Sequence, residues 1–295
     1  MTALKLFVLF LVLPLMATLW LARAPRTQPV VWWAAFLFAT AFVAQSVIIA
    51  PWGWLSIAWR YVLVIVYIAA LLFSLMRRGV PPVAFPRSVI IIELVLAFVF
   101  GALAVLGLLG WIPPDDVIAL DFPFADGAYI VAQGGGSVVI NYHHVYAPQR
   151  YALDIVRLNR FGMRASGFYP SDLTKYAIFG TEIHSPCDGF VVEARDGVPD
   201  LAPPNRTPSL PEGNYVKLNC GGTFVILAHM RRGTVRVGVG DVVSRHDILG
   251  NVGNSGNTTE PHLHIHAERD GRGVGILLLG RWPVRNRVFV PSAAD

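Results

Sequence analysis

The chain has 295 residues, of which 54% are hydrophobic and only 15% are charged, and its formal net charge is +5. This apolar excess excludes an ordinary soluble protein. No block rich in Lys and Arg is present, so the sequence gives no indication of nucleic-acid binding. Because the apolar runs end near Trp111, we expect a membrane domain over residues 1–112, a linker over 113–135 and a folded domain over 136–295.

Four apolar segments are long enough to cross a bilayer as helices. They cover approximately residues 3–21, 30–49, 55–76 and 88–111. Tryptophans at or near several of their ends are typical of the membrane interface. The first segment could instead be a signal peptide, since residues 22–24 resemble a small-x-small cleavage site. Pro25 after that site and three further spans favour a retained helix.

The arginines between the segments predict the orientation in the membrane. Residues 22–29 and 77–87 hold two and three arginines respectively, the latter including Arg78, whereas residues 50–54 hold none. Loops rich in Lys and Arg remain cytoplasmic. We therefore expect a multi-pass protein of the cytoplasmic membrane, partnered by the lipid bilayer, with everything after Trp111 extracytoplasmic.

From about Ile118 the pattern changes to short β-rich runs separated by Gly, Pro and Asn, which is typical of an all-β domain. The strands that we expect to position a site cover residues 137–142, 151–156, 190–194, 214–218 and 223–228. The chain has two cysteines, Cys187 and Cys220, without the spacing of a zinc or redox motif. One disulfide and two buried thiols are both compatible with this pattern.

Histidines alternate with aliphatic residues in the stretch 261–266, so His262, His264 and His266 would share one face of a strand. Neutral imidazole is a common metal ligand and a common general base near pH 7. Asp154 lies within an apolar strand, where a carboxylate needs a partner. His229 ends another strand. Histidines that merely form hydrogen bonds in a half-buried strand are the structural alternative.

The order of Asp154, Ala228-His229, Gly253-Asn-Ser-Gly256 and Pro261-His-Leu-His264 resembles the lysostaphin-like, LytM-type zinc metallopeptidases that cut peptide cross-links of peptidoglycan. The resemblance covers about residues 151–267 and implies an all-β core with Zn²⁺ in a groove. It implies that Asp154 and His264 bind the metal. It further implies that His262 and His229 act on the attacking water and on the oxyanion. We interpret His266 as a supporting residue.

One departure concerns the first metal ligand, because the family's His-x-x-x-Asp motif would place it at Arg150. Arginine stays protonated and does not bind zinc. If Val145 paired with Arg150 in a hairpin, His143 would share a face with Asp154, and a slip of one residue would substitute His144. We assign His143 to the metal site, with His144 as the alternative. The remaining alternative is a site without metal.

These features predict an N-terminal four-helix transmembrane region followed by an all-β LytM-type peptidase-like domain. The predicted function is that of a membrane-anchored zinc metalloendopeptidase acting on peptidoglycan peptides. The alternative is an inactive LytM-like module that binds cell-wall peptides or regulates another hydrolase. Residues 237–250 also resemble half of a lipoyl or biotinyl carrier, but no lysine follows Lys217 to be modified.

Overall fold

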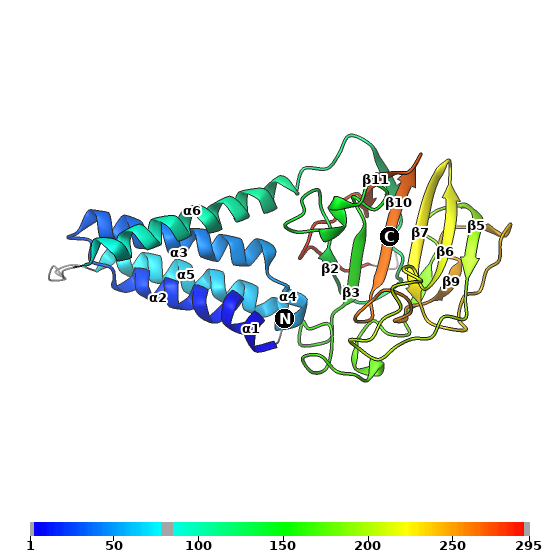
Figure 1. Ribbon diagram of the computed structural model, residues 1–295, viewed down its shortest axis with the longest axis horizontal. Helices are drawn as coiled ribbons and strands as arrows, with labels where there is room; N and C mark the ends of the chain where they lie inside the picture. Colours follow the sequence, from blue (N-terminus) through cyan, green and yellow to red (C-terminus); the bar gives the residue numbers. More distant parts are fainter. Residues whose placement is uncertain (1–2, 78–84, 292–295) are drawn as a thin grey trace. The chain divides into compact units, whose positions relative to one another are not determined.

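The computed structural model describes residues 3–77 and 85–291, and Arg78 lies outside them. The chain divides into two compact units, Met1–Leu108 and Leu109–Asp295. The first is built from helices and the second from strands (Figure 1). The predicted fold class, four long apolar helices followed by an all-β domain, is confirmed.

The helical unit consists of α1 (Ala3–Phe7), a π-helical turn η1 (Val8–Val12), α2 (Leu13–Arg23), α3 (Pro29–Ile49), α4 (Trp52–Leu55), α5 (Ile57–Met76) and α6 (Arg87–Leu109). Four stretches are long and apolar enough to cross a membrane: Leu4–Arg23, Pro29–Ile49, Ile57–Met76 and Arg87–Leu109. Each overlaps one of the predicted segments.

Proline and serine residues account for several of the helix boundaries. Pro29 begins α3, where its fixed φ and missing N–H suit the first turn of a helix. Pro14 follows the π-helical turn η1, because its ring cannot donate the usual helical hydrogen bond. Ser56 separates α4 from α5, and its hydroxyl accepts a hydrogen bond from the Ala58 amide at 3.3 Å. The third span therefore begins two residues later than the sequence predicted.

Small residues and a few polar contacts hold the helices together. Ala35 of α3 is fully buried and lets neighbouring helices approach closely. The Trp32 indole donates a hydrogen bond to the Ser74 hydroxyl at 2.7 Å, which joins α3 to α5. The Trp20 indole donates to a Glu93 carboxylate oxygen at 2.6 Å, which joins α2 to α6.

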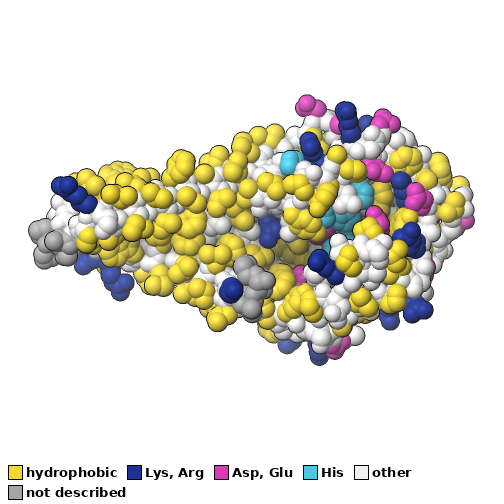
Figure 2. Space-filling view, in the orientation of Figure 1, with side chains coloured by type: hydrophobic (Ala, Val, Ile, Leu, Met, Phe, Trp, Pro, Cys, Tyr) yellow, Lys and Arg dark blue, Asp and Glu magenta, His cyan; other side chains and the backbone are white. Residues whose placement is uncertain are grey.

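The outer surface of the helices remains apolar. Phe98 is 78% exposed, Met76 71% and Ile65 65%. Figure 2 shows apolar side chains over the visible face of the helical unit. A soluble protein rarely exposes an apolar patch of this extent, so lipid is the solvent that this surface suits.

The β unit contains twelve strands among the described residues. They are β1 (Val117–Leu120), β2 (Tyr129–Gln133), β3 (Leu153–Arg157), β4 (Glu182–His184), β5 (Gly189–Arg195), β6 (Asn214–Cys220), β7 (Thr223–Met230), β8 (Val242–Val243), β9 (Ile248–Asn251), β10 (Leu263–Arg269), β11 (Arg272–Leu278) and β12 (Val288–Phe289). The main sheet has the order β12-β2-β3-β10-β7-β6-β5-β8, while β11 pairs with β10 and β1. Strands β4 and β9 form a separate pair.

The alternation of apolar and polar residues in the central strands places one face against a core. Leu153 and Ile155 of β3, Leu227 of β7, and Leu263 and Ile265 of β10 are fully buried in it. Because side chains alternate across a strand, Asp154 and His264 emerge on the opposite face. The same alternation that builds the core therefore builds the site.

A disulfide joins Cys187, just before β5, to Cys220 at the end of β6, with the two Cα atoms 5.9 Å apart. Strands β6 and β7 form the predicted hairpin, and its turn uses Gly221 and Gly222 at positive φ. The disulfide thus ties the β5–β6 pair at the end where the hairpin turns.

Two predictions are corrected by the structure. Residues 113–135 are not simply a linker, because β1 pairs in parallel with β11, and β2 pairs with β3 and β12. Residues 137–142 do not form a strand; they lead into a 3₁₀ turn, η2 (Tyr142–Val145). In the first case, partners distant in sequence satisfy the backbone, and local patterns do not reveal them. In the second case, the Ile140 and Asn141 amides donate to the nearby Ser137 carbonyl, which forms a turn in place of a strand.

Candidate metal centre

Strand pairing brings two of the predicted residues together. Strand β10 lies between β3 and β7, and the register places His264 opposite Asp154 on one side and Ala228 on the other. Directly opposed residues on one face of a sheet are close neighbours. Accordingly, His264 Nδ1 lies 3.0 Å from Asp154 Oδ1, and both side chains are buried.

The third member of the group is His143, which comes from the turn η2 rather than from a strand. Asn141 begins this turn: its side-chain oxygen accepts a hydrogen bond from the His143 amide at 3.2 Å. Its amide group donates to the carbonyls of Gly135 and Ala152 at 3.1 and 3.0 Å. The buried asparagine therefore fixes the turn, and His143 Nε2 lies 3.1 and 3.2 Å from the two Asp154 oxygens.

The predicted hairpin between residues 145 and 150 is absent from the described chain, so the reasoning that selected His143 was wrong although the structure brings His143 to Asp154. His144 lies outside the group, with its Nδ1 3.3 Å from the Arg150 carbonyl. Arg150 itself is exposed.

The other two predicted residues stand beside this group. His262 Nε2 lies 3.4 Å from Asp154 Oδ1, and its Nδ1 is 2.8 Å from the Glu260 carbonyl, to which it donates. His229 Nδ1 donates to the Ser255 carbonyl at 2.9 Å. The His229 and His262 ring centres are 4.8 Å apart. Both rings are thus oriented through Nδ1, which leaves each Nε2 on the side of the site.

The local backbone explains the position of His229. This residue has a φ of +63°, and the pairing of β6 with β7 shifts register between Asn214 and Val216. A bulge of this kind redirects a side chain near the end of a strand, and strained backbone of this type is concentrated at functional sites. His229 consequently leaves the regular ladder and reaches the same space as His264.

Burial sets the protonation of these groups. Desolvation lowers the pKa of His229 and of His266 well below the usual range and also lowers the pKa of His264. Desolvation by itself would raise the pKa of Asp154, but His143 and His262 outweigh it and hold that pKa well below normal. His262 is also desolvated, yet Asp154 raises its pKa. The site therefore contains a carboxylate and several neutral imidazoles, which are the forms that bind metal.

The donor set fits a metal ion. One ligand atom from each of His143, Asp154 and His264 can be chosen so that all lie within 4.8 Å of one another. Imidazole nitrogen and carboxylate oxygen are typical zinc ligands, and three protein ligands are usual at catalytic zinc.

The contact with His266 suits His264 to the role of a metal ligand. His264 Nε2 lies 3.0 Å from His266 Nδ1, and His264 Nδ1 lies 3.0 Å from Asp154 Oδ1. In the tautomer that donates Nε2–H to His266, the Nδ1 lone pair points toward Asp154, where a metal ion would accept it.

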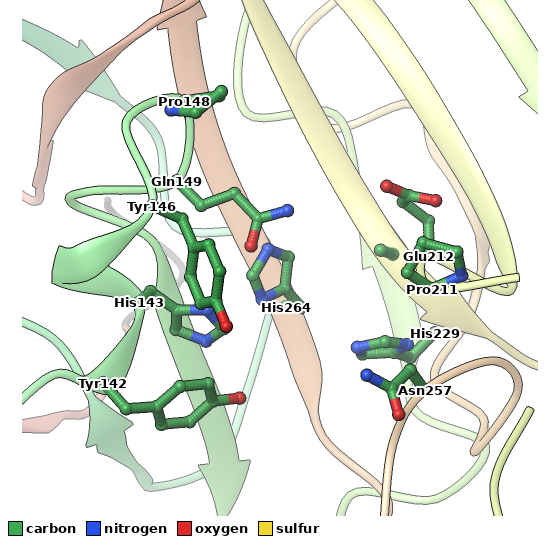
Figure 3. Close-up of a pocket in the computed structure, with 11 residues that line it drawn as sticks. Tyr142, His143, Tyr146, Pro148, Gln149, Pro211, Glu212, His229, Asn257 and His264 are labelled. Carbon is green, nitrogen blue, oxygen red and sulfur yellow. The ribbon is translucent and has the colours of Figure 1, made fainter. Parts of the chain in front are cut away.

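The site opens into a cleft of about 400 Å³. One side of the cleft is lined by His143, Tyr142, Tyr146 and Gln149 (Figure 3). The other side is lined by Pro211, Glu212, His229 and Asn257, and His264 lies between the two sides. In the space-filling view, histidine atoms are visible in a hollow of the β unit (Figure 2). A peptide-sized ligand can therefore reach the histidines.

Sequence reasoning missed two groups around the site. The Tyr142 hydroxyl donates to Asp154 Oδ2 at 3.3 Å. Arg164, in the loop between β3 and β4, forms a buried ion pair with Glu260 at 2.7 Å, and Glu260 supplies the carbonyl that orients His262. Tyr142 is adjacent to His143 and could have been proposed with it, whereas nothing local links Arg164 to Glu260.

Comparison with known proteins identifies the domain. The model of Peptidase family M23 matches residues 173–275, which include β4–β10. No curated protein matches the chain significantly. The match begins after His143 and Asp154, so these two residues lie outside it.

Solved structures also resemble parts of the chain. A putative M23 peptidase from Pseudomonas aeruginosa is 22% identical, with 62% of this chain and 57% of that chain covered and a TM-score of 0.32. A zinc-containing peptidase from Vibrio cholerae is 19% identical, with 42% and 48% covered and a TM-score of 0.26. The lysostaphin catalytic domain from Staphylococcus simulans is 26% identical, with 41% and 74% covered and a TM-score of 0.25. The alignments thus span only about half the length of the first two.

Proposed function

Because the chain contains an M23 peptidase domain at residues 173–275, we propose that it is a zinc metalloendopeptidase that hydrolyses peptide bonds of peptidoglycan. The observation that carries the proposal is the convergence of His143, Asp154 and His264 beside two further histidines in an open cleft. His143, Asp154 and His264 would hold the metal. When bound there, zinc supplies Lewis acidity toward water and a peptide carbonyl.

The remaining chemistry belongs to His229 and His262. Each has its Nδ1 proton committed to a backbone carbonyl, so Nε2 is the nitrogen left for chemistry. His229 lines the cleft, and His262 Nε2 lies 3.4 Å from Asp154 Oδ1. One of them accepts the proton of the attacking water as general base. The other donates a hydrogen bond to the oxyanion that develops on the peptide carbonyl. Asp154 next to His262 favours the cationic form of that ring, which suits the donor role.

Anchoring and orientation extend the proposal. In this proposal the four apolar helices hold the enzyme in the cytoplasmic membrane, and the arginine distribution supports an orientation with the β unit outside, where peptidoglycan lies. Protease added to intact spheroplasts should then digest the β unit. Protection of that unit in intact spheroplasts, with digestion after lysis, would contradict this orientation.

The test of the metal site compares variants of the full chain in detergent micelles. We expect about one zinc per chain, lost in His143→Ala and His264→Ala and kept in His144→Ala, because only the first two face Asp154. His229→Ala should keep zinc and lose hydrolysis of purified peptidoglycan. A folded chain that binds no zinc would contradict the proposal and favour the inactive wall-binding module.

A further inference from the structure

The cleft has a charge that the metal chemistry does not use. Among the described residues that line the cleft, Glu212 is the one ionisable residue, apart from the histidines, with a formal charge at pH 7. No lysine or arginine within residues 3–77 and 85–291 lines it. Tyr142, Tyr146, Gln149 and Asn257 supply the other polar groups. A ligand in this space therefore meets one carboxylate and no opposing cation from the lining.

The fold holds Glu212 beside the reacting groups. Its carbonyl accepts a hydrogen bond from the His229 amide at 2.9 Å. The next residue, Gly213, has a φ of +63°, and a Cβ there would overlap the backbone of Ser255. Only glycine suits such a position, so the turn that carries Glu212 is fixed against the loop whose Ser255 carbonyl orients His229.

The side chain itself is available to a ligand. Glu212 is half-buried, and its carboxylate has no ion pair or hydrogen bond with any residue that the structure describes. Figure 3 shows it on the wall that carries His229, across the cleft from Tyr146 and Gln149. Tyrosine rings on the opposite wall add a surface that favours cations.

We propose that Glu212 is a specificity-determining residue that selects peptides carrying an ammonium group close to the bond that is cut. This inference rests on the proposed peptidase function and names its substrate class. The ammonium could be the side-chain amine of a diamino acid or a free α-amine. Both offer the same charged donors, and a charge-assisted hydrogen bond to one carboxylate favours either by roughly ten-fold over a neutral group.

The test uses the full chain in micelles and three peptides of one sequence. The first has a free side-chain amine and an acetylated α-amine, the second has the reverse, and the third is acetylated at both. Dissociation constants are measured on protein whose metal has been removed with a chelator, and kcat/KM is measured on the zinc-loaded protein. Glu212→Gln removes the charge, and Glu182→Gln is the matched control, because Glu182 is exposed and pairs with Arg236.

We expect wild type and Glu182→Gln to bind one of the amine peptides about ten-fold more tightly than the doubly acetylated peptide. In Glu212→Gln the ratio of the two dissociation constants (doubly acetylated peptide over amine peptide) should fall to about one. Glu212→Lys should make the amine peptide the weaker ligand. The amine peptide that loses its advantage identifies the source of the ammonium. Equal ratios in wild type and Glu212→Gln would overturn the inference.

The two proposals fail in different ways. If the binding ratio depends on Glu212 but no peptide or peptidoglycan is cleaved, the inference on specificity stands and the peptidase function fails. If the kcat/KM values for the amine peptides and for the doubly acetylated peptide have the same ratio in every variant, the peptidase function stands and Glu212 has no role in selection.

Discussion

His266 provides a quantitative test of the metal site because, among the described residues, its hydrogen bond to the site is made to His264. Its Nδ1 lies 3.0 Å from His264 Nε2, and both side chains are buried. A histidine that binds metal through one nitrogen commonly donates its other N–H to a fixed acceptor, which sets the tautomer and the ring orientation. His266→Leu fills most of the space but removes the acceptor, so the His264 N–H is left unsatisfied.

The expected loss follows from that one hydrogen bond. A buried donor without a partner costs about 1–3 kcal/mol, which corresponds to roughly 5- to 150-fold in an equilibrium constant. Measured losses for supporting residues at metal sites are about 10- to 100-fold. We therefore expect the zinc dissociation constant of the full chain at pH 7.5 to rise about 10- to 100-fold, as measured by competition with a chelator.

Two further variants separate this role from simple packing. His266→Asn offers an amide oxygen where the imidazole nitrogen stood and should recover most of the affinity. His246→Leu, at an exposed histidine, should leave zinc binding unchanged. If His266→Leu changed the dissociation constant by less than about two-fold, or if Asn were no better than Leu, the assigned tautomer would be wrong.

The remaining predictions concern stability. Replacing Cys187 and Cys220 by alanine removes a link between residues 33 apart in sequence, and the chain-entropy relation gives a loss of about 4 kcal/mol in the free energy of unfolding. Urea unfolding of the full chain, followed by pulse proteolysis, measures this loss. A loss below about 1 kcal/mol would argue against stabilisation through chain entropy. Arg164→Met breaks the buried pair with Glu260 and should cost about 3–5 kcal/mol. The exposed pair of Arg236 should cost less than about 1 kcal/mol when broken in the same way, and equal losses for the two arginines would refute the reasoning.

The strands around the site could be predicted because their information is local. Alternation in residues 262–266 places the histidines on one face, and glycines mark the β6–β7 turn. The resemblance then assigned roles to His229, His262 and His264. What it could not supply was register, which depends on the pairing of β10 with β3 and β7.

The parts that could not be predicted depend on specific contacts between residues that are not neighbours in the sequence. The turn that carries His143 is fixed by Asn141, whose partners Gly135 and Ala152 lie on either side of it in the chain. Strand β1 forms only because β11, more than a hundred residues later, is available to pair with it. Local propensity does not encode such partners.

The position of His143 also explains how Arg150 can occur where the family motif has a metal ligand. A metal site requires donor atoms at suitable separations, not donors on a particular strand. Here the turn before β3 directs an imidazole at Asp154, and the Nε2 atom reaches the carboxylate from outside the sheet. Residue 150, where the family motif has its histidine, is then not needed as a ligand, and Arg150 is exposed to solvent there. A sequence search that requires both residues of the motif on one strand would miss this arrangement, whereas a search for three converging donors finds it.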